Sequence, residues 1–170
     1  IPLLVGKQDQ ALKVFPDQTK RDSRLRHLEP QVRKAGLAFA CDEFDAYSMP
    51  TAQRCFREDT FESQGKAPLR LYACAGEYES AQIVLTPKRK DTVTYQVMTT
   101  PLAGPGGSVA CESVNDFLYV PVRLPSSYNA LFRLGDYPEA LLPVTQAELK
   151  PTGNHPMFIT YHVPLGGKPG

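Results

Sequence analysis

Two glutamates, Glu77 and Glu79, flank a tyrosine in the segment AGEYESAQ, and a pair of carboxylates is what glycosidases use for acid and base work. If the segment enters a β-strand, the two side chains share one face, with Cβ atoms about 7 Å apart. That spacing is compatible with catalysis. A catalytic pair, however, normally lies across a sugar from different elements, whereas neighbouring strand positions are exposed or cap backbone N–H groups. We therefore expect Glu77 and Glu79 to belong to the framework of a sheet, and we assign no catalytic residue.

The other residues capable of chemistry are scattered along the chain. His27, His155 and His162 are far apart in sequence, so neither a metal site nor a catalytic histidine is predicted. Ser80 and the serines at 126–127 lack a G-x-S-x-G context, and no glycine-rich phosphate loop is present. The sequence predicts no metal and no cofactor.

Tyrosine offers the remaining possibility of ligand contact. Exposed aromatic rings can stack on sugar rings, and the chain has 8 tyrosines and no tryptophan. Tyrosines are just as often half-buried strand residues with the hydroxyl at the rim. The candidates for glycan contact are Tyr78, Tyr128 and Tyr137.

Four cysteines stand at positions 41, 55, 74 and 111, without the C-x-x-C spacing of zinc sites. Two alternatives stay open. Either at least one disulfide forms, Cys41 and Cys55 being the closest pair in sequence, or all four thiols are unpaired and buried. A disulfide requires an oxidising compartment, and we expect an extracytoplasmic location, secreted or periplasmic.

Length and charge exclude several classes of partner. A chain of 170 residues can form one domain with an extension and can bury a proper core. Its 19 basic and 18 acidic side chains cancel almost completely, so we expect neither nucleic acid nor an anionic membrane as a partner. No uninterrupted apolar run of about 18 residues predicts a membrane helix.

Short strands separated by turn residues dominate the chain from residue 69 onward. The predicted strands are 69–75, 81–86, 92–100, 116–124 and 157–164. In the fourth, the expected core face consists of Leu118, Val120, Val122 and Leu124. With 16 prolines, 12 glycines and no convincing amphipathic helix, the pattern predicts an all-β fold built as an antiparallel two-layer β-sandwich.

The first part of the chain has a different composition. Charge is dense from Lys20 to Lys34, and a proline at position 30 would break a helix there. We expect residues 1–65 to form an irregular, partly helical N-terminal extension, and residues 66–170 to form the β-sandwich domain, lacking its last strand.

Three segments occur in a characteristic order: GEYESAQIVL at 76–85, DYPEALLPV at 136–144 and HPMFITYHVPLGGKPG at 155–170. This series resembles the N-terminal β-sandwich domain of glycoside hydrolases similar to the β-N-acetylgalactosaminidases, and the resemblance covers roughly residues 69 to 170. It implies that the catalytic acid pair lies in a downstream barrel domain and acts with the acetamido group of the substrate. None of those catalytic residues can be carried over to this chain.

The resemblance therefore implies a non-catalytic domain of an enzyme that acts on N-acetylhexosamine-containing glycans. Its partner would be the downstream catalytic domain, which it supports, and it could contact the glycan. The alternative is a self-standing β-sandwich module that binds a glycan or a protein. An independent hydrolase is a distant third interpretation.

Overall fold

The computed structural model describes residues 26–27, 31–122 and 133–167. Every helix or strand found in these residues is a β-strand, so the predicted all-β class is confirmed. The strands are β1 (Arg26–His27), β2 (Val32–Ala40), β3 (Phe44–Met49), β4 (Thr60–Lys66), β5 (Tyr78–Pro87), β6 (Val93–Gln96), β7 (Leu102–Gly104), β8 (Gly107–Val109), β9 (Cys111–Val122), β10 (Arg133–Pro143), β11 (Gln146–Leu149) and β12 (His155–His162).

The chain divides into two compact units, one formed by residues 1–28 with 121–135 and the other by residues 29–120 with 136–170. In the first unit, the described strand contact is a short parallel pair in which β1 lies beside the start of β10, with Arg26 opposite Arg133. The second unit carries the core and the sites discussed below.

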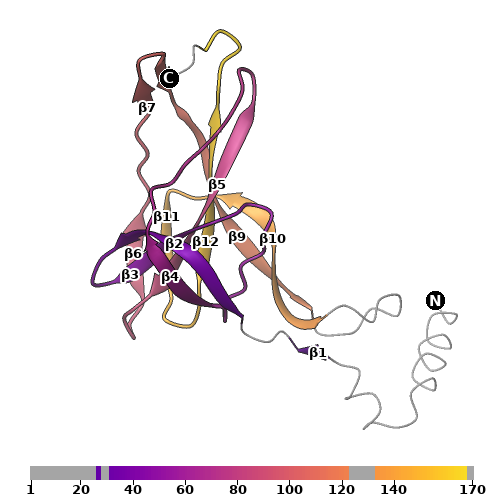
Figure 1. The fold of residues 1–170 in the computed structure, drawn as a ribbon. Coiled ribbons are helices and arrows are strands. Elements are labelled where there is room, and N and C mark those ends of the chain that lie inside the picture. The colour runs from indigo at the N-terminus through magenta and orange to yellow at the C-terminus, as the bar shows by residue number, and fades with distance from the viewer. Residues whose placement is uncertain (1–25, 28–30, 123–132, 168–170) are drawn as a thin grey trace, which may run out of the picture. The chain divides into compact units, whose positions relative to one another are not determined.

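One large sheet organises the second unit, with the strand order β10-β9-β12-β5-β3-β2-β4 (Figure 1). β12 runs antiparallel to both β5 and β9, and β3 runs antiparallel to β2 and β5. β4, however, is parallel to β2, with Val32 opposite Thr60. The sheet is therefore mixed and not purely antiparallel as predicted, because β4 follows β3 in sequence but pairs on the far side of β2.

The predicted irregular, partly helical extension over residues 1–65 needs correction in its described part. β2, β3 and most of β4 lie there, no helix is present in the described residues, and β3 pairs with β5 from Phe44 to Met49. A register shift between Leu37 and Phe39 interrupts the regular alternation of β2. Such a bulge changes which side chains share a face, and this conceals a strand from a search for period-two patterns.

Several predicted strands agree with the structure, and one does not. The run 81–86 lies within β5, and 157–164 overlaps β12. The run 69–75 forms no strand. Its alternation is equally compatible with an extended segment that has no ladder partner, and periodicity alone does not separate the two cases.

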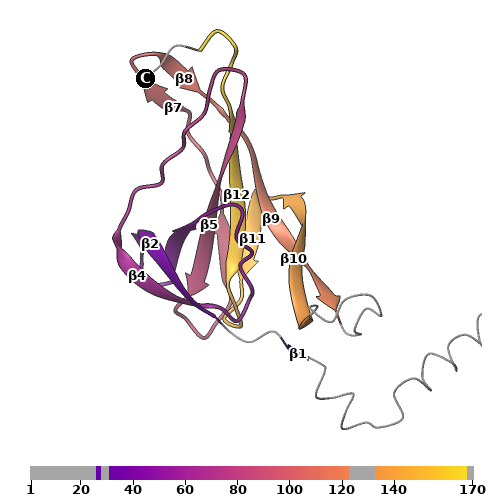
Figure 2. The ribbon, with the colours of Figure 1, turned by 45° about the vertical axis from the view of Figure 1, so that its right-hand side comes forward.

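Two apolar clusters pack on opposite faces of the sheet, because neighbouring residues of a strand point to opposite sides. On the first, which we call face A, Val84 packs in a cluster with Cys55 of the segment 50–59. On the second, face B, Leu85 packs with Leu149 of the small β6–β11 sheet. A two-stranded sheet thus covers part of face B and an irregular segment covers part of face A. Figure 2 shows the strands of the large sheet from a second side.

Between Leu118 and Val120 the exposed and covered sides of β9 are the reverse of the prediction, whereas Val122 is half-buried. The predicted core residues Leu118 and Val120 are 48% and 40% exposed, and Leu124 lies outside the described residues. Tyr119 is the covered residue, and its hydroxyl donates a hydrogen bond to the carbonyl oxygen of Cys55 at 2.9 Å. Both alternating sets of β9 contain apolar side chains, so the position of the 50–59 segment decides which set is covered.

Candidate functional site

Glu77 lies in a tight turn and binds backbone groups of that turn. Its Oε2 accepts a hydrogen bond from the N–H of Cys74 at 2.8 Å, and its own N–H donates to the carbonyl oxygen of Cys74 at 3.2 Å. Gly76, in the same turn, has a φ of +85°, a conformation that other residues rarely adopt. A Cβ at Gly76 would also meet Leu165 Cδ2 at 2.8 Å. Glu77 thus caps a backbone N–H, the arrangement expected of a framework residue.

Glu79 belongs to the ladder itself. It lies in β5 directly opposite Tyr161 of β12, and it is half-buried. The two glutamates of the motif thus take part in different local structures, one in a turn and one in a strand.

The three tyrosines predicted to contact a glycan differ in their surroundings. Tyr78 is 62% exposed, and its ring stacks on that of His162, with centroids 4.2 Å apart and planes inclined by 12°. Tyr137 is 8% exposed, and its ring meets that of Phe56 edge to face at 5.5 Å between centroids. Tyr128 lies outside the described residues. Of the two described rings, Tyr78 is the one that presents a large surface to solvent.

His155 has a structural position at the start of β12. It is buried, and its Nε2 accepts a hydrogen bond from the backbone N–H of Lys150 at 3.2 Å. Burial, together with the positive charges of Arg57 and Lys150, lowers the pKa of His155 to about 4. The ring is therefore neutral near pH 7, as an acceptor nitrogen requires. Of His27, the structure describes the backbone strand alone.

All four cysteines are free, which corrects the disulfide alternative for Cys41 and Cys55. Cys55 is 1% exposed, and burial raises the pKa of its thiol to about 12. Such a thiol is a poor nucleophile, because the reactive form is the thiolate. Within the described part of the chain, no group of three or more histidine, cysteine, aspartate or glutamate residues is arranged to hold a metal ion.

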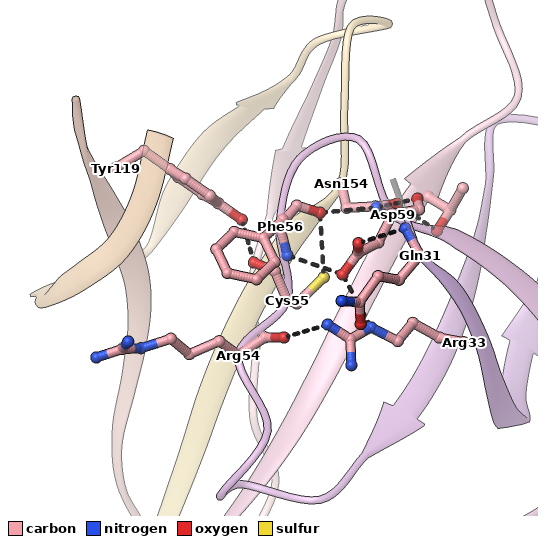
Figure 3. Close-up of polar contacts among 9 residues, drawn as sticks. Gln31, Arg33, Arg54, Cys55, Phe56, Asp59, Tyr119 and Asn154 are labelled. Carbon is pink, nitrogen blue, oxygen red and sulfur yellow. Dashed lines mark hydrogen bonds and ion pairs between the residues drawn. The ribbon is translucent and has the colours of Figure 1, made fainter. Parts of the chain in front are cut away.

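A buried polar cluster around Asp59 is the most highly connected group of side chains on face A (Figure 3). The Oδ2 of Asp59 accepts hydrogen bonds from Arg33 Nε at 2.9 Å and from the N–H of Phe56 at 3.1 Å. Its Oδ1 accepts from the N–H of Gln31 at 3.1 Å. The carboxylate is completely buried, and the guanidinium beside it is mostly buried as well. Three donors thus compensate the burial of one negative charge.

Asn154 completes this cluster from the start of β12. Its Nδ2 donates to the carbonyl oxygens of Asp59 at 2.6 Å and of Phe56 at 3.2 Å, and its Oδ1 accepts from the hydroxyl of Thr86 at 2.9 Å. The carboxylate of Asp59 and the amide of Asn154 form hydrogen bonds with backbone groups of the 50–59 segment. The cluster therefore anchors that segment. It has the chemistry of a structural site and not of a catalytic one.

The sequence carries no signal that would have identified this anchor. Asp59 stands in the charged run REDT beside Glu58, which is exposed. Local sequence does not show which of the two acidic residues is buried. Asp59 is the buried one, and its partner Arg33 lies 26 positions earlier in the chain.

A second group of polar side chains lies on face A, on the neighbouring strands β5, β12 and β9. We call it the polar strip, and it consists of Tyr78, Ser80, Gln82, Ser113, Asn115, Thr160 and His162, together with the apolar Phe158 between Gln82 and Asn115. The strand register arranges them in three rows. The first row pairs Tyr78 with His162, the second has Thr160 opposite Ser80 and Ser113, and the third has Phe158 opposite Gln82 and Asn115. Partners directly opposite each other point to the same face of a sheet.

Hydrogen bonds satisfy only part of the polar strip. The hydroxyls of Ser80 and Thr160 lie 2.9 Å apart, and Asn115 Nδ2 donates to Ser113 Oγ at 3.0 Å. Gln82 is 1% exposed, and neither its amide nitrogen nor its amide oxygen has a hydrogen-bond partner. Sequence reasoning missed this group because it depends on the register between three strands that are far apart in the chain.

The chain was compared with protein-family models and with curated proteins, and neither comparison gave a match. Within the described residues, no helix is both long and apolar enough to cross a membrane.

Proposed function

We propose that this chain is a non-catalytic β-domain of a carbohydrate-active enzyme, one that acts on N-acetylhexosamine-containing glycans, and that it supports the catalytic barrel of that enzyme. The observation that carries the proposal is the position of Glu77, whose carboxylate caps the turn that leads into β5. The acidic motif therefore serves the fold, as a supporting domain requires. The segments behind the resemblance also fall on framework elements, namely β5, β10 and β12.

An exposed apolar surface gives further support to the proposal. Leu118 and Val120 of β9 and Leu142 of the neighbouring β10 are each at least 40% exposed. Large apolar side chains gathered on adjacent strands favour contact with another protein surface. In this proposal, that surface belongs to the catalytic domain of the same polypeptide, since domains within one chain form interfaces with each other.

Hydrolysis of 4-nitrophenyl N-acetyl-β-D-galactosaminide tests the proposed function. We expect the parent protein to release nitrophenol and this chain alone to release none. We also expect the parent with Glu77→Gln to retain its turnover, because the glutamine oxygen can still accept the hydrogen bond from Cys74. Glu79→Gln is the matched control from the same motif.

Two results would overturn the proposal. One is hydrolysis by this chain alone that disappears in Glu77→Gln, which would make Glu77 a catalytic residue. The other is a parent protein that fails to hydrolyse this substrate and its N-acetylglucosaminide analogue, which would remove the link to N-acetylhexosamine.

The exposed ring of Tyr78 favours the second candidate, a self-standing module that binds a glycan. The coding sequence downstream of Gly170 separates the two candidates. A catalytic barrel would appear as about 250 residues of alternating strand and helix patterns. A stop codon directly after Gly170 would favour the module.

A further inference from the structure

The polar strip occupies a place in the sheet where apolar side chains are expected. In the next row of face A, Val84 lies opposite Tyr47 and Pro156, and all three are buried. A sheet face that packs on a core is normally apolar in this way. The next row on the same face contains Gln82 of β5, Phe158 of β12 and Asn115 of β9, so two of its three side chains are polar. The row after that contains Ser80, Thr160 and Ser113, which all carry a hydroxyl group.

The polar strip is also within reach of solvent. Ser80, Ser113, Asn115 and Thr160 are half-buried, and Tyr78 is largely exposed. The strip therefore leads from an exposed aromatic ring to a deeply buried amide, that of Gln82. A polar surface of this kind can exchange its bound water for a ligand without rearrangement of the sheet.

Gln82 provides an independent indication of a ligand. Proteins rarely bury an amide without hydrogen-bond partners, and such groups occur where a bound molecule or a catalytic role accounts for them. The amide of Asn154, at the other end of the same face, has all of the partners described above. Gln82 follows the half-buried Ser80 on the same face of β5, so its amide lies next to the accessible part of the strip.

The side chains of the strip define the chemistry of a suitable ligand. The strip contains no aspartate, glutamate, lysine or arginine, so it offers no strong charge to select an ion. It offers hydroxyl and amide groups that both donate and accept hydrogen bonds. At its exposed end, the ring of Tyr78 is held in place by stacking on His162, so one flat apolar surface is preorganised. A molecule with one apolar flat side and several hydroxyl groups fits both features.

We infer that the polar strip is a binding subsite for a neutral saccharide on this chain itself. The sugar ring packs against Tyr78, and its hydroxyl or acetamido groups bind the hydroxyls of Ser80 and Thr160 in the next row of the strip. This inference deepens the proposed function and rests on it for the choice of sugar alone, since the subsite needs no barrel.

Titration of the isotope-labelled chain with methyl N-acetyl-β-D-galactosaminide, followed by NMR, tests the subsite. We expect saturable shifts of the side-chain amide signals of Asn115 and Gln82. Tyr78→Ala removes the stacking surface and should weaken binding about tenfold, as expected for the loss of one aromatic contact. Tyr78→Phe keeps the ring and should bind within about twofold of the original chain.

Tyr72→Ala is the matched control, because Tyr72 is also a highly exposed tyrosine but lies outside the strip. It should leave the affinity unchanged. Thr160→Val is the second variant for the strip itself, and it should also weaken binding because it removes one of the two hydroxyls that bind the sugar. The amide spectrum of each variant shows whether the chain is folded before its affinity is compared.

The absence of saturable shifts with this sugar, with methyl β-D-galactoside and with methyl β-D-glucoside would overturn the inference. Binding that survives both Tyr78→Ala and Thr160→Val would overturn it as well, since the sugar would then bind elsewhere. The two proposals fail separately. Hydrolysis by the parent without binding to the strip removes the subsite alone, and binding to the strip without hydrolysis by the parent removes the proposed function alone.

Discussion

The two ends of face A bury polar groups in opposite ways. At the packed end, the carboxylate of Asp59 accepts from three donors and the amide of Asn154 binds two carbonyl oxygens and a hydroxyl. At the open end, the amide of Gln82 is just as deeply buried but has no partner. A completed network stabilises a fold, whereas an incomplete one costs free energy and marks a place where a ligand can contribute.

The packed end also explains how the 50–59 segment is held across the sheet. Arg33 of β2 binds both Asp59 and the carbonyl oxygen of Arg54, at 3.0 Å. On the opposite side, the guanidinium of Arg57 lies 3.9 Å from the centroid of the Tyr119 ring. The segment is thus attached to β2 and to β9, which are separated by three other strands in the sheet.

Removal of the Asp59 carboxylate should have the largest effect. Asp59→Ala leaves Arg33 and two backbone N–H groups without their acceptor, and we expect a loss of about 4 kcal/mol in the free energy of unfolding. Urea denaturation followed by circular dichroism measures this loss.

Glu139→Ala is the control for the Asp59 experiment. Glu139 also pairs with an arginine, Arg54, at 3.3 Å, but both side chains are about half exposed. An exposed ion pair contributes less than about 1 kcal/mol. Equal losses for Asp59→Ala and Glu139→Ala would contradict the role of Asp59 as a buried anchor.

The free energy of unfolding should fall in acid because His155 is buried in its neutral form. Because the pKa of His155 is about 4 in the folded chain and near 6.5 when unfolded, the unfolded chain takes up the proton first as the pH falls. The stabilisation is complete above pH 6.5 and is lost as the pH falls from there toward about 4. We expect this residue to remove about 2 kcal/mol of stability over that range.

The pH dependence is measured as the urea midpoint of the original chain and of His155→Gln at several pH values. The glutamine can accept the hydrogen bond from Lys150 but cannot take up a proton in this range. The variant should therefore have the flatter profile between pH 6.5 and 4. Two parallel profiles would show that His155 is not responsible.

The smallest expected effect has the opposite sign and concerns the open end. Gln82→Met replaces the unpartnered amide with an apolar side chain of similar length, and we expect a gain of about 1 kcal/mol in stability. Thermal unfolding of the unliganded chain measures the gain. Asn154→Leu is the matched comparison and should lose about 2 kcal/mol, since it removes a fully bonded amide. A loss of stability in both variants would mean that the amide of Gln82, like that of Asn154, stabilises the folded chain.

Much of the fold could be predicted from local sequence. Alternating apolar and polar residues in 81–86 and 157–164 identified parts of β5 and β12, because a strand exposes successive residues on opposite faces. The capping of a backbone N–H by Glu77 could also be predicted, since a glutamate beside a turn glycine has backbone N–H groups within reach. β2 was missed because the register shift between Leu37 and Phe39 breaks its alternation.

The sequence by itself therefore determined the all-β class and the capping of a backbone N–H by Glu77, both of which depend on residues close together in the chain. Only the tertiary structure decided that Asp59 is an anchor, that Tyr119 and not Leu118 is covered, and that Gln82 lies in one row with Phe158 and Asn115. The physical reason is distance along the chain. Asn154 binds Asp59 across 95 positions and Phe56 across 98, and no local pattern encodes contacts between segments so far apart.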